Sequence, residues 1–298
     1  MANLIDIRRR IRSVKNTQQI TKAMKMVAAA RLRRSQDRIL ATRPYALEIR
    51  KVIGNLAARV ASADAESAPH PLLEKRPEKR VLLVIVTGDK GLAGSFNASV
   101  LRRAGEVLAA VRRDGSEVEL LLLGKKGNDF FRRRDLTVRK GYSSLFTNVT
   151  YAQAQEIADD IAAAYAAREY DAVHVVYNQF KSMIAQELSQ ETLLPIGAGR
   201  GAAATKEDGA APREYLFEPK AEAILAQLLP RYVTFQVYRI LLESQAAEHA
   251  ARMTAMDSAT KNASEMIERL TLRYNRARQA AITTELIEVV SGANALEG

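Results

Sequence analysis

Hydrophobic residues near the start of the chain recur at the spacing of a helix that packs along a second helix. The residues that follow this spacing of three and four are Leu4, Ile7, Ile11 and Val14 and, further on, Tyr45, Ile49, Val52 and Leu56. Such a seam is typical of a coiled coil. It loosens through Gln18 and Thr21, and Pro44 is the one internal helix breaker. The pattern predicts a single amphipathic helix over residues 1–60.

The end of the chain carries a longer seam of the same kind. Its members are Leu225, Leu228, Tyr232, Phe235, Arg239, Leu242, Ala246, His249, Met253, Met256, Thr260, Ala263, Ile267, Leu270, Tyr274, Ala277 and Ala281. Pro219 suits a first helical position, whereas Pro230 should bend the helix. At 1.5 Å per residue this helix would be roughly 100 Å long, longer than a compact domain of this size. We expect it to project and to pair with the N-terminal helix, leaving its own longer tip alone.

Continuous apolar runs replace the helical seams in the middle of the chain. The runs are VLLVIVT (81–87), VELLLLG (118–124) and AVHVVYN (172–178). Each ends in turn residues, as strands buried on both faces of a sheet do. The helical stretches between them cover about residues 97–113, 125–133 and 151–168. This alternation predicts a parallel α/β sheet, to which residues 188–196 are a candidate addition.

The predicted fold class is α/β: a long antiparallel two-helix coiled coil, formed by the N- and C-terminal helices, plus a Rossmann-like α/β domain. The four predicted segments are an N-terminal coiled-coil helix (1–60), a linker (61–80), an α/β globular domain (81–218) and a C-terminal coiled-coil helix (219–298). Three prolines and mixed charge indicate the linker. The Gly- and Ala-rich run at 197–213 predicts a mobile surface loop to which we assign no role.

The excess positive charge lies in the first predicted helix. The whole chain has a net charge of +11, and residues 1–59 contain fifteen lysines and arginines against three acidic residues. The remainder is therefore close to neutral. A segment with such an excess is usually a surface for an acidic partner.

Composition and run lengths also exclude several classes of protein. The chain has no cysteine, which rules out disulfides and thiolate metal sites and fits a reducing compartment. No apolar run approaches the roughly 20 residues of a membrane span, and the N-terminus lacks the apolar region of a signal peptide. We expect a soluble protein in the cytoplasm that reaches a membrane only by binding something embedded in it.

The segment TGDKGLAGSFN (87–97) lies between a predicted strand and a predicted helix, where phosphate-binding loops occur. The spacing of its three glycines fits neither the Walker pattern nor Gly-x-Gly-x-x-Gly. We interpret it as a tight turn, with Ser95 or Asn97 capping the helix.

Catalytic and metal-binding chemistry has weak support. His70, His174 and His249 lie far apart, and no His-x-x-x-His or Glu-x-x-His spacing occurs. His249 lies on the C-terminal seam, where a core histidine is expected. We expect no catalytic residue, cofactor or metal site. The first helix has no aromatic residue before Tyr45 on which a base could stack, so we favour an acidic protein surface over nucleic acid as its partner.

Four segments resemble one known family. They are IRRRIRSVKNTQQITKAMKMVAAARLRRSQ, TGDKGLAGSFN, LLPRYVTFQVYRILLESQAAEHAARMTAMDSATKNASEMI and YNRARQAAITTELIEVVSGANAL. In order and over essentially the whole chain they are similar to the γ subunits of F-type ATP synthases. The resemblance implies a central rotor that transmits torque between the membrane c-ring and the catalytic hexamer of α and β subunits. It would couple proton translocation to ATP synthesis or hydrolysis without being catalytic itself.

The resemblance also implies partners and contact residues. It implies one copy per complex, at the cytoplasmic face of the cell membrane, bound to the α and β subunits, the ε subunit and the c-ring. Coupling contacts to the catalytic subunits would come from Met24, Arg252, Arg278, Gln279, Thr283 and Glu285. Foot contacts to the c-ring and ε would come from Arg33, Arg34, Tyr215, Phe217 and Glu218. Ala93 stands where many relatives have cysteine, and thiol control of the chloroplast type is not expected.

Two other classes stay open at this point. A nucleotide-binding enzyme with a coiled-coil arm would bind ATP or NAD in a way that depends on Gly91 and Gly94. A nucleic-acid-binding coiled coil would bind DNA with a steep salt dependence. For a rotor, long cationic side chains near acidic loops give weak, screened contacts that exchange readily, which accounts for the basic helix.

Overall fold

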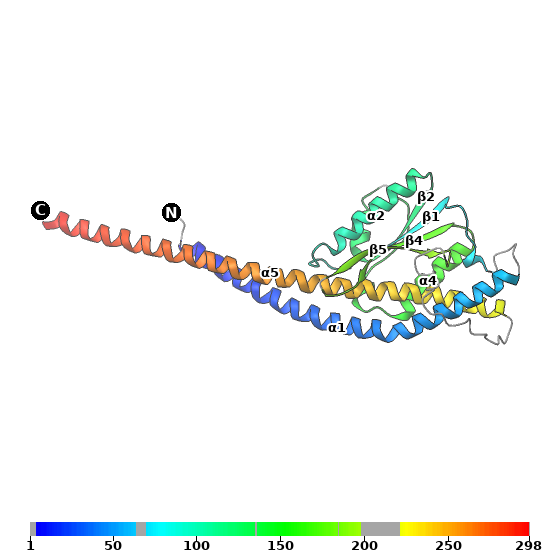
Figure 1. The fold of residues 1–298 in the computed structure, drawn as a ribbon. Coiled ribbons are helices and arrows are strands. Elements are labelled where there is room, and N and C mark those ends of the chain that lie inside the picture. Colours follow the sequence, from blue (N-terminus) through cyan, green and yellow to red (C-terminus); the bar gives the residue numbers. More distant parts are fainter. Residues whose placement is uncertain (1–3, 64–69, 135, 184, 198–220, 298) are drawn as a thin grey trace. The chain divides into compact units, whose positions relative to one another are not determined.

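The computed structural model describes residues 4–63, 70–134, 136–183, 185–197 and 221–297 (Figure 1). Its longest elements are two helices, α1 (Leu4–Ala63) and α5 (Ala221–Glu297). The chain divides into two compact units. The helical unit comprises Met1–Ala29 and Arg252–Gly298, and the α/β unit comprises Ala30–Ala251. The segment boundaries expected from the sequence stay a prediction.

The α/β unit is built on one five-stranded sheet with the order β3-β2-β1-β4-β5. The strands are β1 (Arg80–Val86), β2 (Glu117–Leu123), β3 (Val138–Tyr142), β4 (Ala172–Phe180) and β5 (Gln186–Leu194). The pairs β1–β2, β1–β4 and β2–β3 are parallel, whereas β5 is antiparallel to β4. The predicted parallel arrangement is confirmed for β1 to β4. The candidate strand at 188–196, whose direction was not predicted, is the antiparallel strand β5, because a short connection returns the chain directly beside β4.

Strand β3 was not expected from the sequence. It reads VRKGY and none of its residues is buried. As an edge strand it pairs on one side only, so it lacks the apolar run that identified β1, β2 and β4.

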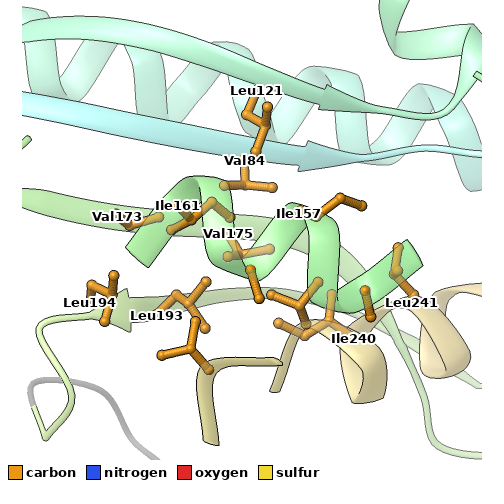
Figure 2. Close-up of a cluster of buried hydrophobic side chains, with 14 of the residues drawn as sticks. Val84, Leu121, Ile157, Ile161, Val173, Val175, Leu193, Leu194, Ile240 and Leu241 are labelled. Atoms are coloured by element: carbon orange, nitrogen blue, oxygen red, sulfur yellow. The ribbon is translucent and has the colours of Figure 1, made fainter. Parts of the chain in front are cut away.

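Helices cover both faces of this sheet because each central strand is apolar on both sides. On one face, Leu83 and Ile85 pack with α2 (Phe96–Arg113) and α3 (Lys125–Phe131). On the other, Val84 and its neighbours pack with α4 (Tyr151–Ala166) and with α5. Figure 1 shows α2 on one side of the sheet and α4 on the other. Figure 2 shows this second core, in which Ile240 and Leu241 of α5 meet Ile157 and Ile161 of α4.

Within the α/β unit, one stretch of α5 is buried on all sides rather than along one seam. Residues 244–250 are all buried. The seam predicted from heptad spacing is therefore too narrow here, because the helix contributes to the core on the sheet and also contacts α1, where Ser35 Oγ lies 3.3 Å from Gln245 Oε1. His249 is buried, as its seam position predicts.

Neither internal proline interrupts its helix, and part of the expected linker is folded. The helices are continuous through Pro44 and Pro230, and Thr234 Oγ1 donates to the Pro230 carbonyl. Part of the expected linker is folded, since Pro71–Leu73 forms a 3-10 turn whose Leu72 is buried in the core. Most of the expected loop at 197–213 lies outside the described residues.

Candidate functional site: the paired terminal helices

Side-chain hydrogen bonds join α1 and α5 in the helical unit, and four of them link residues that the structure describes. They are Arg8 Nη2 to Tyr274 Oη (2.6 Å), Gln18 Nε2 to Ser264 Oγ (2.7 Å), Thr21 Oγ1 to Thr260 Oγ1 (2.8 Å) and Lys25 Nζ to Asp257 Oδ1 (2.6 Å). From Arg8 to Lys25 the position on α1 rises by 17, while the partner on α5 falls by 17, from Tyr274 to Asp257. The two helices are therefore antiparallel and keep one register over this length, which confirms the predicted coiled coil.

The buried line of this pair follows the predicted spacing. Thr21 and Ala28 of α1 are buried, as are Met256 and Ala263 of α5. Further along α5, each seam residue is half-buried between exposed neighbours, namely Ile267, Leu270, Tyr274, Ala277 and Ala281. The seam does not break at Gln18 and Thr21, where its apolar character loosens. Their polar groups bond across the interface instead.

The last described turns of α5 form an exposed apolar segment, which we call the tip (residues 282–294). Every residue of the tip is exposed. Its large apolar residues include Leu286 at 60%, Val289 at 70% and Val290 at 58% exposure. In water such a surface is unfavourable, and contiguous exposed apolar residues of this kind mark interaction sites.

The α1 half of the helical unit presents a row of cations. Its exposed lysines and arginines are Arg8, Arg9, Arg10, Arg12, Lys15 and Lys22. Asp6 is the one acidic residue among the described residues of this half. The surface therefore attracts acidic partners over a range set by ionic strength.

The loop at 87–97 supplies a carboxylate that accepts hydrogen bonds from backbone groups of two other segments. Asp89 Oδ1 accepts from the backbone N–H of Lys125 (3.0 Å) and of Ser144 (2.9 Å), and Oδ2 accepts from Phe146 N–H (2.9 Å). These donors lie beyond the carboxyl ends of β2 and β3, where α/β folds bind ligands. Because a carboxylate already occupies them, the nucleotide-binding alternative loses support.

The rest of this loop is a tight turn, as expected, although the capping differs. Ser95 precedes α2 but its side chain makes no capping hydrogen bond. Asn97 lies inside α2 and closes the loop, because its Oδ1 accepts from Gly88 N–H and its Nδ2 donates to the Lys90 carbonyl. At the neighbouring β2 end, Gly124 has φ +105, and a Cβ there would lie 2.0 Å from the Thr87 carbonyl oxygen.

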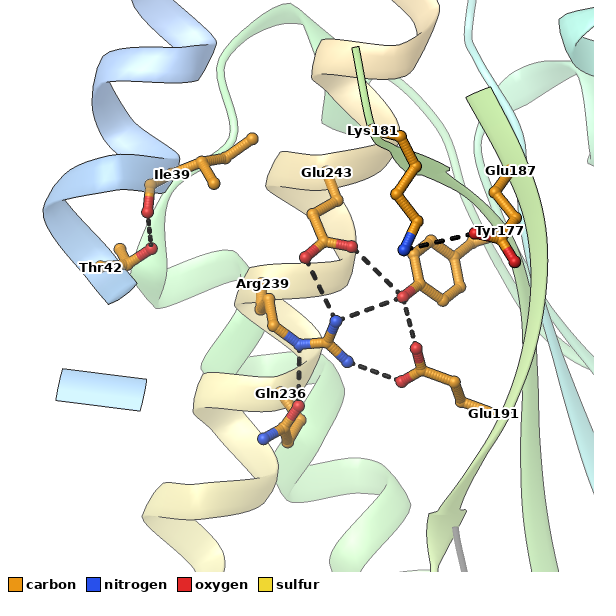
Figure 3. A network of polar contacts seen from close by, with 9 residues as sticks. All are labelled: Ile39, Thr42, Tyr177, Lys181, Glu187, Glu191, Gln236, Arg239 and Glu243. Atoms are coloured by element: carbon orange, nitrogen blue, oxygen red, sulfur yellow. Dashed lines mark hydrogen bonds and ion pairs between the residues drawn. The ribbon is translucent and has the colours of Figure 1, made fainter. Parts of the chain in front are cut away.

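A buried polar network, not expected from the sequence, ties α5 to β5 in the α/β unit (Figure 3). Arg239 donates to Glu191 Oε2 (2.6 Å) and Glu243 Oε1 (3.2 Å), and Tyr177 Oη donates to Glu191 Oε1 (2.6 Å). Burial raises the pKa of Tyr177 far above its usual range. Burial alone would lower the pKa of Arg239, but the surrounding acidic groups raise it on balance. One feature of the sequence could have indicated this network: Arg239 is the one arginine or lysine in the predicted C-terminal seam.

Residues 3–296 match the protein family described as ATP synthase. The ATP synthase gamma chain of Solibacter usitatus (strain Ellin6076) is 52% identical and that of Geobacter sp. (strain M21) is 48% identical, each over 100% of both chains. The chain belongs to the ATP synthase gamma chain family.

Solved structures agree with this membership in the ATP synthase gamma chain family. A chain of the Tetrahymena thermophila mitochondrial ATP synthase central stalk and c-ring aligns with a TM-score of 0.58 and 30% identity, over 80% of this chain and 99% of that one. A chain of the Euglena gracilis mitochondrial ATP synthase (OSCP/F1/c-ring) aligns with a TM-score of 0.66 over 98% and 94% of the two chains. Its identity of 19% makes it a likeness of fold alone.

The contact residues that the gamma family implies are distributed over both units. Met24 and Arg252 of the helical unit are half-buried. Four others are exposed and lie on one eight-residue stretch of α5 that includes the start of the tip, namely Arg278, Gln279, Thr283 and Glu285. Arg33 and Arg34 are exposed in the α/β unit. The expected positions of Tyr215, Phe217 and Glu218 lie outside the described residues. The roles of all these residues stay predictions.

The surroundings of the histidines and acidic side chains give no support to the enzyme alternative. His174 Nε2 lies 3.1 Å from Glu78 and His70 caps a 3-10 turn, so both take part in local structure. Across the described ranges, no group of three or more His, Asp or Glu side chains could hold a metal ion. Among the helices of these ranges, none is long and apolar enough to cross a bilayer.

Proposed function

We propose that this chain is the central rotor subunit of an F-type ATP synthase and transmits torque between a c-ring in the membrane and a catalytic hexamer of α and β subunits. The observation that carries the proposal is the antiparallel helix pair with one register and an exposed apolar tip. A tip of this kind is favourable only when another surface encloses it. The central opening of a ring of subunits is such a surface.

The charge of the helical unit supports rotation within that ring. The cations along α1 can meet acidic loops of the surrounding subunits, and exposed ion pairs of this kind contribute only about 0–1 kcal/mol each. A rotor needs contacts that form and exchange at each orientation. Weak ionic contacts allow this, whereas an extended apolar face along the whole pair would hold one orientation.

We assign the chain no catalytic residue. The Asp89 carboxylate accepts hydrogen bonds from three backbone donors at the carboxyl edge of the sheet, so a nucleotide phosphate could not use these three donors. In the proposal, ATP chemistry belongs to the α and β subunits, and this chain changes their conformation in turn.

The contact residues divide by position on the chain. Arg278, Gln279, Thr283 and Glu285, together with Met24 and Arg252, would meet the catalytic subunits. Thr283 Oγ1 already donates to the Gln279 carbonyl, so a partner would donate a hydrogen bond to this oxygen or pack on the methyl group. Arg33 and Arg34, with Tyr215, Phe217 and Glu218, would contact the c-ring and ε. The complex would hold one copy of the chain as a peripheral protein on the cytoplasmic face of the cell membrane.

Reconstitution tests this proposal directly. The full chain should copurify with α, β and ε subunits in one copy per hexamer, and the complex in vesicles should pump protons when given ATP. Absence of α and β from the purified complex would refute the proposal. Exchange of Arg33 and Arg34 for Glu should reduce binding of the c-ring or ε while the isolated chain stays folded.

Removal of the tip gives a second test. A chain ending at Ala281 lacks residues that are exposed, so the α/β unit should keep its unfolding temperature. Proton pumping per ATP hydrolysed should fall, because the part enclosed by the hexamer is missing. Undiminished pumping would remove the tip from the coupling mechanism.

A further inference from the structure

Three of the four contacts between the helices of the helical unit form a continuous polar ladder. Its rungs are Gln18 to Ser264, Thr21 to Thr260 and Lys25 to Asp257. The ladder lies between the aliphatic seam residues Ile7, Ile11 and Val14 on one side and Ala28 on the other. A polar group in a seam reduces stability relative to an apolar one, so its presence calls for another role.

An aliphatic seam alone does not fix the register of two helices. Its residues repeat every heptad, so a slip of seven residues again faces each seam position with a seam position. In the native register Ile11 and Val14 lie opposite Leu270 and Ile267, and a slip of one heptad would place them opposite Ala277 and Tyr274, which are also seam residues. Such a slip would move α5 along α1 by about 10 Å, at 1.5 Å per residue.

The rungs differ in how strongly they resist a slip. Thr260 Oγ1 also donates to the Met256 carbonyl, and Ser264 Oγ to the Thr260 carbonyl. These hydroxyls therefore keep a partner on their own helix if the opposite helix moves. Gln18 and Lys25 take their contacts from the opposite helix, so a slip removes what they bind.

The charges add a directional element to the ladder. Asp257 lies between two cations, since its other oxygen is 3.2 Å from Lys261 Nζ. The hydrogen bond from Lys25 and then that from Lys261 lower the pKa of Asp257, as expected for a carboxylate held by both. A slip of one heptad toward the end of α5 would face Lys25 with Ser264 and Gln18 with Thr271. The ion pair would be lost.

We propose that Gln18 and Lys25, through Ser264 and Asp257, are positioning residues that fix the register of the paired terminal helices. The length of the tip that extends past α1 follows from this register. Under the proposed rotor function, and resting on it, the ladder therefore sets how far the shaft reaches into the hexamer.

The cysteine-free chain allows a direct test by disulfide formation. The register of the four contacts places Val14 opposite Ile267, so a chain with Val14→Cys and Ile267→Cys reports the native register. A chain with Val14→Cys and Tyr274→Cys reports a slip of one heptad. In otherwise native chains, only the first pair should form a disulfide efficiently.

Charge exchange then isolates the ion pair. Lys25→Glu faces Asp257 with a like charge. The disulfide yield of the chain that reports the native register, divided by the yield of the chain that reports the slip, should then fall about fivefold or more. Lys25→Glu with Asp257→Lys restores an opposite-charge pair and should restore the ratio. Lys22→Glu makes the same charge change at an exposed position three residues away and should leave it unchanged.

The roles of the ion pair and of Gln18 are refuted by different results. An unchanged ratio in Lys25→Glu, or no recovery in the double exchange, overturns the role of the ion pair. Gln18→Leu extends the aliphatic seam and should produce slipped disulfide in a fully helical chain; a native product alone removes Gln18 from the proposal.

A reconstituted complex tests the consequence for the shaft. Pumping per ATP hydrolysed should fall in Lys25→Glu and recover in the double exchange. If the disulfides respond and pumping does not, the link between register and reach is refuted while the ladder stands. If even the native chain fails to assemble, the rotor function fails, and the disulfide result is unaffected.

Discussion

One helix, α5, has two different environments in this molecule. In the α/β unit residues 244–250 are buried on every face, whereas in the helical unit residues 282–294 are exposed on every face. Between these extremes, residues 253–281 bury one seam. Secondary structure is the same throughout, so its stability must come from different sources: core packing in the first region, a single partner helix in the second, and intrinsic helix propensity in the tip.

The polar contacts of the two units differ in the same way. Arg239 lies among acceptors from four residues, and little of its side chain is exposed. Lys25 and Asp257 are each more than one third exposed at the side chain. Burial makes loss of one partner costly, while exposure makes a pair weak but still able to discriminate between registers.

The largest effect is expected from deletion of a core side chain of α5 in the α/β unit. Leu241 is 1% exposed, so Leu241→Ala should lower the free energy of unfolding by about 3 kcal/mol through lost burial and a residual cavity. Leu272, in the helical unit of the same helix, is 71% exposed, and Leu272→Ala should change it by less than ~0.5 kcal/mol. Urea denaturation measures both. Equal losses would contradict the contrast between the units.

Removal of the buried cation should have a somewhat smaller effect. Arg239→Met leaves the carboxylates of Glu191 and Glu243 without their cation. This should lower the free energy of unfolding by about 2–3 kcal/mol. The loss is expected at or below the range for fully buried pairs because Glu191 is partly exposed. Arg269→Met removes an exposed pair with Glu265 and should cost below ~0.5 kcal/mol.

Two glycines in helices sharpen the comparison further. A Cβ at Gly292 of the tip or at Gly105 of α2 would meet no atom within 4 Å, so alanine fits at both. Each change should favour its helix by about 1 kcal/mol. Gly105→Ala should appear as a higher unfolding free energy of the α/β unit. Gly292→Ala should instead raise the helical circular dichroism signal of the isolated chain without changing that unfolding free energy.

The smallest effect concerns the titration of Asp257. Its pKa lies below the ordinary value of 3.8 because of the hydrogen bond from Lys25. The stabilisation is therefore present above that value and is lost as pH falls through the lower folded-state pKa. Carboxyl NMR should show the pKa rising in Lys25→Ala and staying constant in Lys22→Ala. No response to Lys25→Ala would contradict the ion pair in solution.

Much of this architecture follows from periodicity in the sequence. The heptad spacing of Met256, Ala263 and Ile267 identifies the buried line of the helical unit, and the apolar runs identify β1, β2 and β4. Both patterns arise because one repeating environment selects one residue type. Residues 244–250 departed from the expected seam because several elements surround them at once, which a spacing argument along one helix does not reveal.

Other features depend on side chains that meet only after folding. The partners of Asp89 are backbone groups from residues 36 to 57 positions away, which no local pattern encodes. The partner of Arg239 on β5 is 48 positions away, although its charge within an apolar seam marked the residue as exceptional. For the proposed contact residues the sequence resemblance gives positions, and the structure adds the exposure of eight of them but not their partners.

The carboxylate of Asp89 has one further consequence for an ATP-powered machine. A diffusible anion in that place would stabilise the domain in proportion to the logarithm of its concentration. An anion that is part of the polypeptide is always present at the same effective concentration. At this position the stability of the domain therefore does not depend on the concentration of a bound phosphate or nucleotide.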